Sequence, residues 1–255
     1  DRYVRIAAEE GLRIVAATET HIHADFLSGL GEFADQHGVT LYVSDEGDDV
    51  WRYHWADDSP WDIRLLKDGD VFMVGNIRIE AVHTPGHTPE HMSFLVTDTG
   101  GGANEPIGLA SGDFVFVGAL GRPDLLETAA GVPGAREPAA RALFKSTRRF
   151  LELDDHIQVW PGHGAGSACG KALGAVPQST VGYERRCNVG LSFSDENGFV
   201  GSILEGQPEP PLYFARMKDL NKNGVPLLGA VPAPKPYSLS ELAERGESAN
   251  AVIVD

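Results

Sequence analysis

The chain has 255 residues, of which 42% are hydrophobic, and this combination predicts one large globular domain with an apolar core. Its formal net charge of -16, from 37 acidic and 21 basic residues, argues against nucleic acids and anionic membranes as partners. No run of about 18 apolar residues occurs, so no transmembrane helix is expected.

The predicted elements alternate between helices and strands, which indicates a mixed α and β fold. The predicted helices, in chain order, are 1–10, 26–37, 137–153, 213–220 and 238–246. The predicted strands, in chain order, are 12–17, 40–44, 71–74, 77–82, 91–97, 107–111, 157–160 and 251–255.

The segment 45–62 is polar and aromatic, and we expect it to be a loop. It contains Trp51, Trp55 and Trp61 among many acidic residues. Tryptophans in a loop favour either a lid or wall for a substrate, or a surface flap that packs on its own aromatic side chains.

Three short segments near predicted strand ends carry histidine and aspartate, residue types that can bind metals. His21, His23 and Asp25 alternate along an extended segment, so their side chains share a face. His87 follows the next hairpin and Asp113 follows a later strand. Imidazoles and carboxylates are donors that divalent transition metals prefer, so these segments together predict a metal site.

The motifs around these residues are His21-Ile22-His23-Ala24-Asp25, Pro85-Gly86-His87-Thr88 and Gly112-Asp113. Together with Pro161-Gly162-His163-Gly164, they form a series that resembles the metallo-β-lactamase superfamily over residues 1–207. The resemblance implies an α/β (α+β) fold, the αββα sandwich, with two mixed sheets face to face and the metal at one edge. Members of the family place several strands before the first helix. We therefore expect the chain to lack the first N-terminal strands, which would leave an unpaired strand edge.

Phe26 separates the branches of this superfamily. Hydrolases usually carry H-x-H-x-D-H, and phenylalanine cannot act as the final metal ligand. A second metal would then depend on Asp25, His163 and a shared Asp113, which is a poor set of ligands.

The chain more closely resembles the persulfide dioxygenase branch. That resemblance implies one Fe(II) per chain, bound by His21, His87 and Asp113. In this interpretation His23, Asp25 and His163 orient the ligands or remain from a second site. We predict His23 and Asp25 as the catalytic residues.

Two further segments resemble the same branch and suggest substrate-binding residues. Arg122 lies in Gly121-Arg122-Pro123-Asp124 and is expected either to bind a carboxylate of a glutathione-like substrate or to form a surface ion pair. Cys169 lies in a segment similar to bacterial proteins fused to a rhodanese domain, where this cysteine is linked to sulfur handling. The alternative for Cys169 is a small buried thiol.

These resemblances imply an enzyme, a persulfide dioxygenase that oxidises glutathione persulfide-type substrates with dioxygen to sulfite and thiol. The alternative is a metallo-β-lactamase-type hydrolase with one or two Zn(II) that cleaves a thioester, lactone or β-lactam, with Asp25 as general base or ligand. A scaffold with a decayed metal site is a third interpretation. A homo-oligomer is possible in each case.

Composition along the chain divides it into two parts, a metallo-β-lactamase-like domain over 1–230 and a segment over 231–255. The second part begins as a proline-rich linker. Its helix and strand resemble the start of a rhodanese-like domain, and the alternative is a strand added to the main sheet. No signal peptide is visible, and two cysteines outside any C-x-x-C pattern are consistent with a reducing cytoplasm, one disulfide being the alternative.

Overall fold

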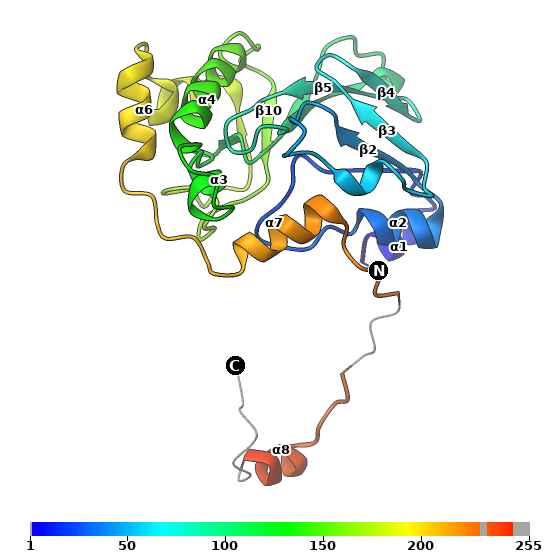
Figure 1. Ribbon diagram of the computed structural model, residues 1–255. Helices are drawn as coiled ribbons and strands as arrows, with labels where there is room; N and C mark the ends of the chain where they lie inside the picture. The colour runs from blue at the N-terminus through cyan, green and yellow to red at the C-terminus, as the bar shows by residue number, and fades with distance from the viewer. Residues whose placement is uncertain (1, 230–233, 247–255) are drawn as a thin grey trace.

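Two β-sheets packed against each other form the centre of the computed structural model, which describes residues 2–229 and 234–246 (Figure 1). The smaller sheet is parallel, with strand order β1-β2-β3, and the larger is mixed, with order β11-β10-β7-β6-β5-β4. A short pair, β8-β9, is separate. The strands are β1 Ala16–Thr18, β2 Thr40–Ser44, β3 Ile63–Leu66, β4 Val71–Val74, β5 Ile77–His83, β6 Met92–Asp98, β7 Gly108–Gly112, β8 Val115–Phe116, β9 Ala119–Leu120, β10 Gln158–Pro161 and β11 Ser179–Thr180.

Helices cover the outer faces of both sheets. Buried side chains of α4 and α6 pack against the larger sheet, and those of α2 pack against the smaller one (Figure 1). The expected αββα sandwich is therefore confirmed, whereas the expectation of two mixed sheets is wrong for the smaller one, whose described strands pair only in parallel. The helices are α1 Arg2–Glu9, α2 Leu30–His37, α3 Leu125–Thr128, α4 Arg136–Phe150, α5 Val181–Cys187, α6 Glu196–Leu204, α7 Phe214–Asn223 and α8 Leu239–Gly246, with 3-10 turns at His54–Ala56, Thr99–Gly101 and Val189–Leu191.

The contact between the sheets is apolar. Tyr42 on β2 stacks on Phe72 on β4 with ring centroids 3.9 Å apart, and Phe94 meets Phe72 edge to face. Leu66 and Met92 complete this buried cluster. Burying one such side chain contributes about 1.5–3 kcal/mol, so these few residues hold the two sheets together.

Most predicted elements are present with shifted ends, and the largest differences lie near the first motif. The helix predicted over 26–37 begins at Leu30 instead. Asn221 accepts a hydrogen bond from the Ser28 amide and donates one to the Phe26 carbonyl, which holds residues 26–28 outside the helix. The strand predicted over 12–17 is β1, Ala16–Thr18, because only these residues pair with β2.

The tryptophan-containing loop belongs partly to the core. Trp51 and Tyr53 are buried in a cluster with residues of β2 and α2, so the interpretation as a separate surface flap is wrong for them. Trp55 and Trp61 are half-buried and line a cavity of about 200 Å³ between α2 and the end of α7. Their role as a substrate wall stays a prediction.

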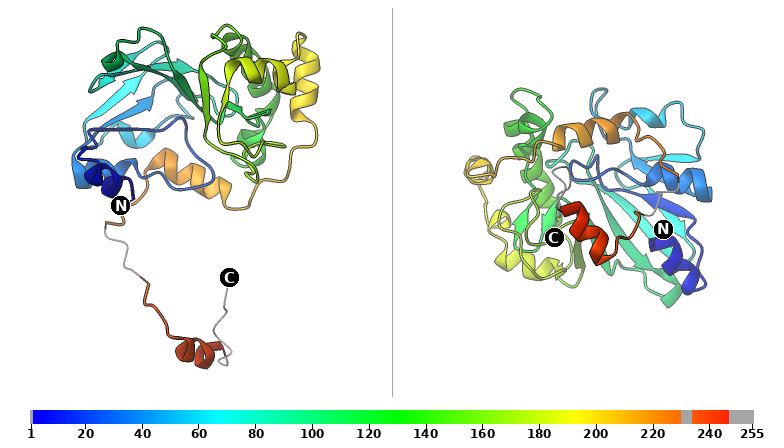
Figure 2. Two further views of the ribbon diagram at one scale, coloured as in Figure 1. Left: turned by 180° about the vertical axis from the view of Figure 1, so that it is seen from behind. Right: turned by 90° about the horizontal axis from the view of Figure 1, so that it is seen from below.

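The C-terminal helix α8 stands apart from the sandwich in Figures 1 and 2. The strand predicted over 251–255 lies outside the described residues, so the two-part division of the chain stays a prediction. Among the helices that the structure describes, none combines the length and the apolar character needed to cross a membrane.

Candidate metal centre

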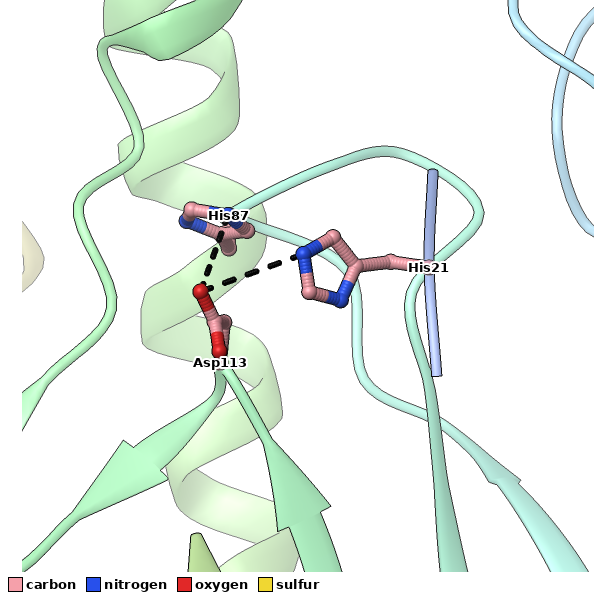
Figure 3. Close-up of side chains that lie close together, drawn as sticks. All are labelled: His21, His87 and Asp113. Atoms are coloured by element: carbon pink, nitrogen blue, oxygen red, sulfur yellow. Dashed lines mark ion pairs between the residues drawn. The ribbon is translucent and has the colours of Figure 1, made fainter. Parts of the chain in front are cut away.

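Three buried donors from three separate loops converge at one edge of the sandwich. His21 follows β1, His87 lies between β5 and β6, and Asp113 follows β7. Asp113 Oδ2 lies 3.4 Å from His87 Nε2 and 3.8 Å from His21 Nε2 (Figure 3). The structure thus brings together the three residues expected to bind a metal, although they come from both sheets.

The donor atoms of this group fit a cation. His21 Nε2, His87 Nε2 and both carboxylate oxygens of Asp113 are buried without a hydrogen-bond partner among the residues described. Buried polar atoms without partners are rare and destabilising, whereas a divalent metal uses such lone pairs directly. Each of the three residues offers one ligand atom, and these atoms lie within 4.8 Å of one another.

In His87 and His21, the contact made by Nδ1 orients the ring and leaves Nε2 to bind a metal. His87 Nδ1 lies 3.0 Å from the carbonyl oxygen of Arg122, which can only accept, so Nδ1 carries the proton and Nε2 is unprotonated. His21 Nδ1 lies 2.9 Å from Thr20 Oγ1. Such partners of metal-binding histidines fix the ring orientation.

His91 positions Asp113 and was not among the expected site residues. The backbone amide of Asp113 donates to His91 Nε2 at 3.0 Å, so the proton of His91 is on Nδ1, which donates to Thr84 Oγ1 at 2.8 Å. The turn needs Gly112, which has φ +53, and a Cβ there would lie 2.8 Å from His91 Nε2. The only sequence signal for His91 is its place four residues after His87.

Burial favours the neutral form of the two candidate histidine ligands. It lowers the pKa of His21 and of His87 well below the usual value, with smaller contributions from nearby histidines and Lys218. Burial also raises the pKa of Asp113 to about 7. Neutral imidazoles are the form that binds a metal, and a bound cation favours the ionised carboxylate.

A second group lies on the more exposed side of the centre. His163 Nε2 is 3.3 Å from Asp25 Oδ2 and 3.4 Å from Asp113 Oδ1, and His23 Nδ1 is 3.8 Å from Asp25 Oδ1. Burial lowers the pKa of His23 to about 3. Ligand atoms of Asp25, His163 and Cys169 also lie within 4.8 Å of one another. The expected additional site residues are therefore gathered next to the three donors.

Phe26, which stands at the position of the final histidine of the hydrolase motif, lies beside His23. Its side chain is half exposed and its ring centroid lies 4.3 Å from that of His23. A cleft of about 520 Å³ is lined by His23 and Phe26, with Gly112 and Gly162 from the neighbouring loops. His23 thus links this cleft to the donors, because its ring centroid lies 4.2 Å from that of His21.

The Arg122 guanidinium is buried and forms an ion pair within the protein. It is 1% exposed, donates from Nε and Nη2 to the two carboxylate oxygens of Asp124 at 2.9 and 2.6 Å, and donates from Nη1 to the Ala168 carbonyl. The expected ion pair with a nearby aspartate is confirmed, although it is buried and not at the surface. The substrate contact stays a prediction, and the guanidinium is already occupied by Asp124 and Ala168. A buried ion pair satisfies the guanidinium, and the Arg122 carbonyl holds His87.

Cys169 is a buried thiol that lies beside the centre. Its exposed fraction is 1%, and burial together with the negative charges of Asp113 and Asp25 raises its pKa far above the usual value. The expected burial is confirmed, whereas a role in sulfur handling stays a prediction. Cys169 and Cys187 are both free, so the alternative of a disulfide is wrong.

Asn221 on α7 holds the first motif in place and was not expected from the sequence. Its Nδ2 donates to the carbonyls of His23 and Phe26 at 2.9 and 2.8 Å, and its Oδ1 accepts from the Ser28 amide at 2.8 Å. The contact spans almost 200 positions of the chain, so no local pattern indicates it.

Comparison with known proteins identifies relatives of this arrangement. Residues 2–163 match the model of the metallo-beta-lactamase superfamily. A "Beta-lactamase hydrolase-like protein" of Xylella fastidiosa (strain 9a5c) is 30% identical over 75% of this chain and 42% of its own length. A "Probable metallo-hydrolase" of Burkholderia pseudomallei (strain 1710b) is 34% identical over 74% of this chain and 64% of its own length. The chain thus spans less than two thirds of either relative.

Two solved structures are also similar. A metallo-beta-lactamase from Staphylococcus aureus subsp. aureus COL is 46% identical, with a TM-score of 0.82 over 93% of this chain and 64% of its own. A protein named ETHE1 from Myxococcus xanthus is 21% identical, with a TM-score of 0.66 over 87% of this chain and 82% of its own. The second likeness concerns the fold alone.

Proposed function

The chain belongs to the metallo-beta-lactamase superfamily of metal-dependent enzymes, and from this premise we propose that it is a persulfide dioxygenase with one Fe(II). The observation that carries the proposal is the buried set of two histidines and one carboxylate, with Phe26 beside it in place of a further ligand. Two histidines and one carboxylate with open positions are the ligands of non-haem iron oxygenases.

The proposed substrate is a small-molecule persulfide such as glutathione persulfide. In the overall reaction, one persulfide, one dioxygen and one water give one thiol, one sulfite and two protons. Fe(II) bound by His21, His87 and Asp113 would supply the redox chemistry that joins dioxygen to the terminal sulfur.

The residues of the chain would hold and orient the reactants. The Arg122 carbonyl and Thr20 hydroxyl fix the two imidazoles, and His91 fixes the backbone of Asp113. His23 and Phe26 border the cleft, so an apolar wall would exclude water from the reacting sulfur on that side. In this proposal Asp25 and His163 accept or donate protons at the open side.

A second candidate function is hydrolysis with zinc. Two of the relatives carry names of hydrolases, and His163 lies within 3.4 Å of both Asp25 and Asp113, as a second metal would require. Phe26 speaks against it, because its side chain cannot complete the second set of ligands.

The proposed compartment is a reducing cytoplasm. Both cysteines are free, and Cys187 is exposed. Disulfides are uncommon where thiols are kept reduced, so free cysteines support this proposal without deciding it.

The deciding experiment measures metal content together with oxygen uptake on glutathione persulfide. The dioxygenase predicts one iron per chain, consumption of one dioxygen per persulfide, and formation of sulfite. His87→Ala should remove the metal, whereas His23→Ala should retain the iron. Two zinc ions per chain, no oxygen uptake and cleavage of a thioester or lactone would refute the proposal and favour the hydrolase.

A further inference from the structure

A buried lysine on α7 has no role in the arrangement described so far. Lys218 is 1% exposed, and its Nζ forms neither a hydrogen bond nor an ion pair with the residues that the structure describes. Its contact with the Trp51 ring, whose centroid lies 5.0 Å from Nζ, is a cation–π interaction that supplies no hydrogen-bond acceptor. A buried ammonium without an acceptor is strongly unfavourable, so its retention needs an explanation.

The helix contacts on either side place Lys218 under the first motif. Phe214, Lys218 and Asn221 follow the spacing of one helix face. Phe214 is buried in a cluster with Ala24 and Cys169, and Asn221 donates to the carbonyl of His23. Lys218 therefore lies on the face of α7 that contacts the His23–Asp25 loop, between Phe214 and Asn221.

The charges around Lys218 agree with this placement. The carboxylates of Glu90, Asp113 and Asp25 favour its charged form, against the burial that lowers its pKa. In the other direction, its positive charge contributes to the lowered pKa values of the site histidines at 21, 23 and 87. The ammonium is therefore close enough to the site residues to interact with them electrostatically.

We propose that Lys218 binds the anionic end of the ligand at the metal centre, which is the terminal sulfur of the persulfide and then an oxygen of the sulfite product. This inference rests on the proposed function for the identity of the anion. Three N–H donors without an acceptor match an anion that reaches Lys218 from the metal side. The competing role is to offset the charge of Glu90, whose Oε2 is also buried without a partner.

The test uses the iron-loaded full chain and sulfite as the probe, with binding measured by calorimetry. Lys218→Met keeps the length of the side chain and removes its charge. It should raise the dissociation constant for sulfite about tenfold or more, as for the loss of one charge-assisted hydrogen bond, with iron content unchanged. The matched control is Lys222→Met, because Lys222 lies 5.4 Å from the same Trp51 ring but is half exposed. It should leave sulfite binding unchanged.

The double variant Glu90→Gln/Lys218→Met separates the two roles and removes both buried charges, so it also serves if the single variant does not fold. Weak sulfite binding in the double variant supports the anion site. Sulfite binding restored to the wild-type level in the double variant would show that Lys218 only offsets Glu90, and this would overturn the proposal. Two results for the single variant Lys218→Met would also overturn it: a sulfite affinity equal to that of wild type, or loss of iron.

The outcome for the proposed function is read separately, from oxygen uptake by the wild-type protein. Uptake with unchanged sulfite affinity in Lys218→Met would reject the anion site and leave the dioxygenase. No uptake, with weakened sulfite binding in Lys218→Met, would reject the dioxygenase and leave the anion site.

Discussion

Replacing Asn221 with alanine should destabilise the protein through the first motif rather than through α7 itself. The Asn221 side chain is 1% exposed and makes three hydrogen bonds of 2.8 to 2.9 Å to the backbone of residues 23–28. Each such bond contributes about 1 kcal/mol, so the variant should lose about 3 kcal/mol of unfolding free energy. For a chain of this size, that corresponds to a fall of about 6–12 °C in Tm.

The assay is urea unfolding of the metal-free protein followed by tryptophan fluorescence, repeated with metal bound. Asn223→Ala is the matched control, because Asn223 is exposed on the same helix and bonds only to Asp219 among the residues described. The control should stay within about 0.5 kcal/mol of wild type, as surface substitutions do. Because Asn221 holds the loop of His23, its loss should also weaken metal binding.

A loss below about 1 kcal/mol in Asn221→Ala would refute the reasoning, because the loss of three hydrogen bonds to partly buried backbone groups exceeds that value. An equal loss in Asn223→Ala would show that the effect belongs to the helix and not to the loop contact.

Three further predictions concern the centre itself. In the metal-free protein at pH 8, Asp113→Asn should be more stable than wild type in urea, because burial raises the pKa of this carboxyl from 3.8 to about 7. Between pH 7 and about pH 4, the carboxyl of Asp113 is protonated in the folded wild type but not in the unfolded chain, so acidification stabilises the wild type. The difference in unfolding free energy between Asp113→Asn and wild type should therefore shrink by about 1.4 kcal/mol per pH unit, and a constant difference would contradict this. Phe26→His should raise zinc stoichiometry from one to two by mass spectrometry, with Asp25 and His163 as partners, and a stoichiometry that stays at one would contradict this. Gly112→Ala should reduce metal occupancy without unfolding the chain, because its Cβ would clash with two side chains within 2.8 Å; full occupancy would show that the loop relaxes freely.

The sequence indicates the centre well because each donor lies in a short local pattern. His21, His87 and Asp113 each follow a strand, and a strand that ends at a sheet edge delivers its next residues to a shared location. The resemblance also implied the fold. The motifs follow one another along the chain as the loops at one edge of the sandwich do. These predictions depend on spacing over a few residues.

The errors come from contacts between distant segments. Arg122 and its partner Asp124 look like a surface turn in the sequence, but neighbouring segments cover them. Trp51 lies in a polar segment of the sequence but is buried in the structure, because α7 covers it. Asn221 and Lys218 reach the first motif only after the whole domain is assembled. Burial of this kind follows from the tertiary arrangement and leaves no local pattern.

The donors of the centre belong to different sheets, and this gives a bound metal a mechanical role. His21 continues from the smaller sheet, whereas His87 and Asp113 extend from the larger one, so a cation held by all three would fasten the sandwich at its edge as a cross-link does. The donors are also far apart along the chain, so the site is complete only after the sheets have met. Metal binding would therefore follow folding. Removal of the metal with a chelator would destabilise the interface between the two sheets before it affects either sheet alone.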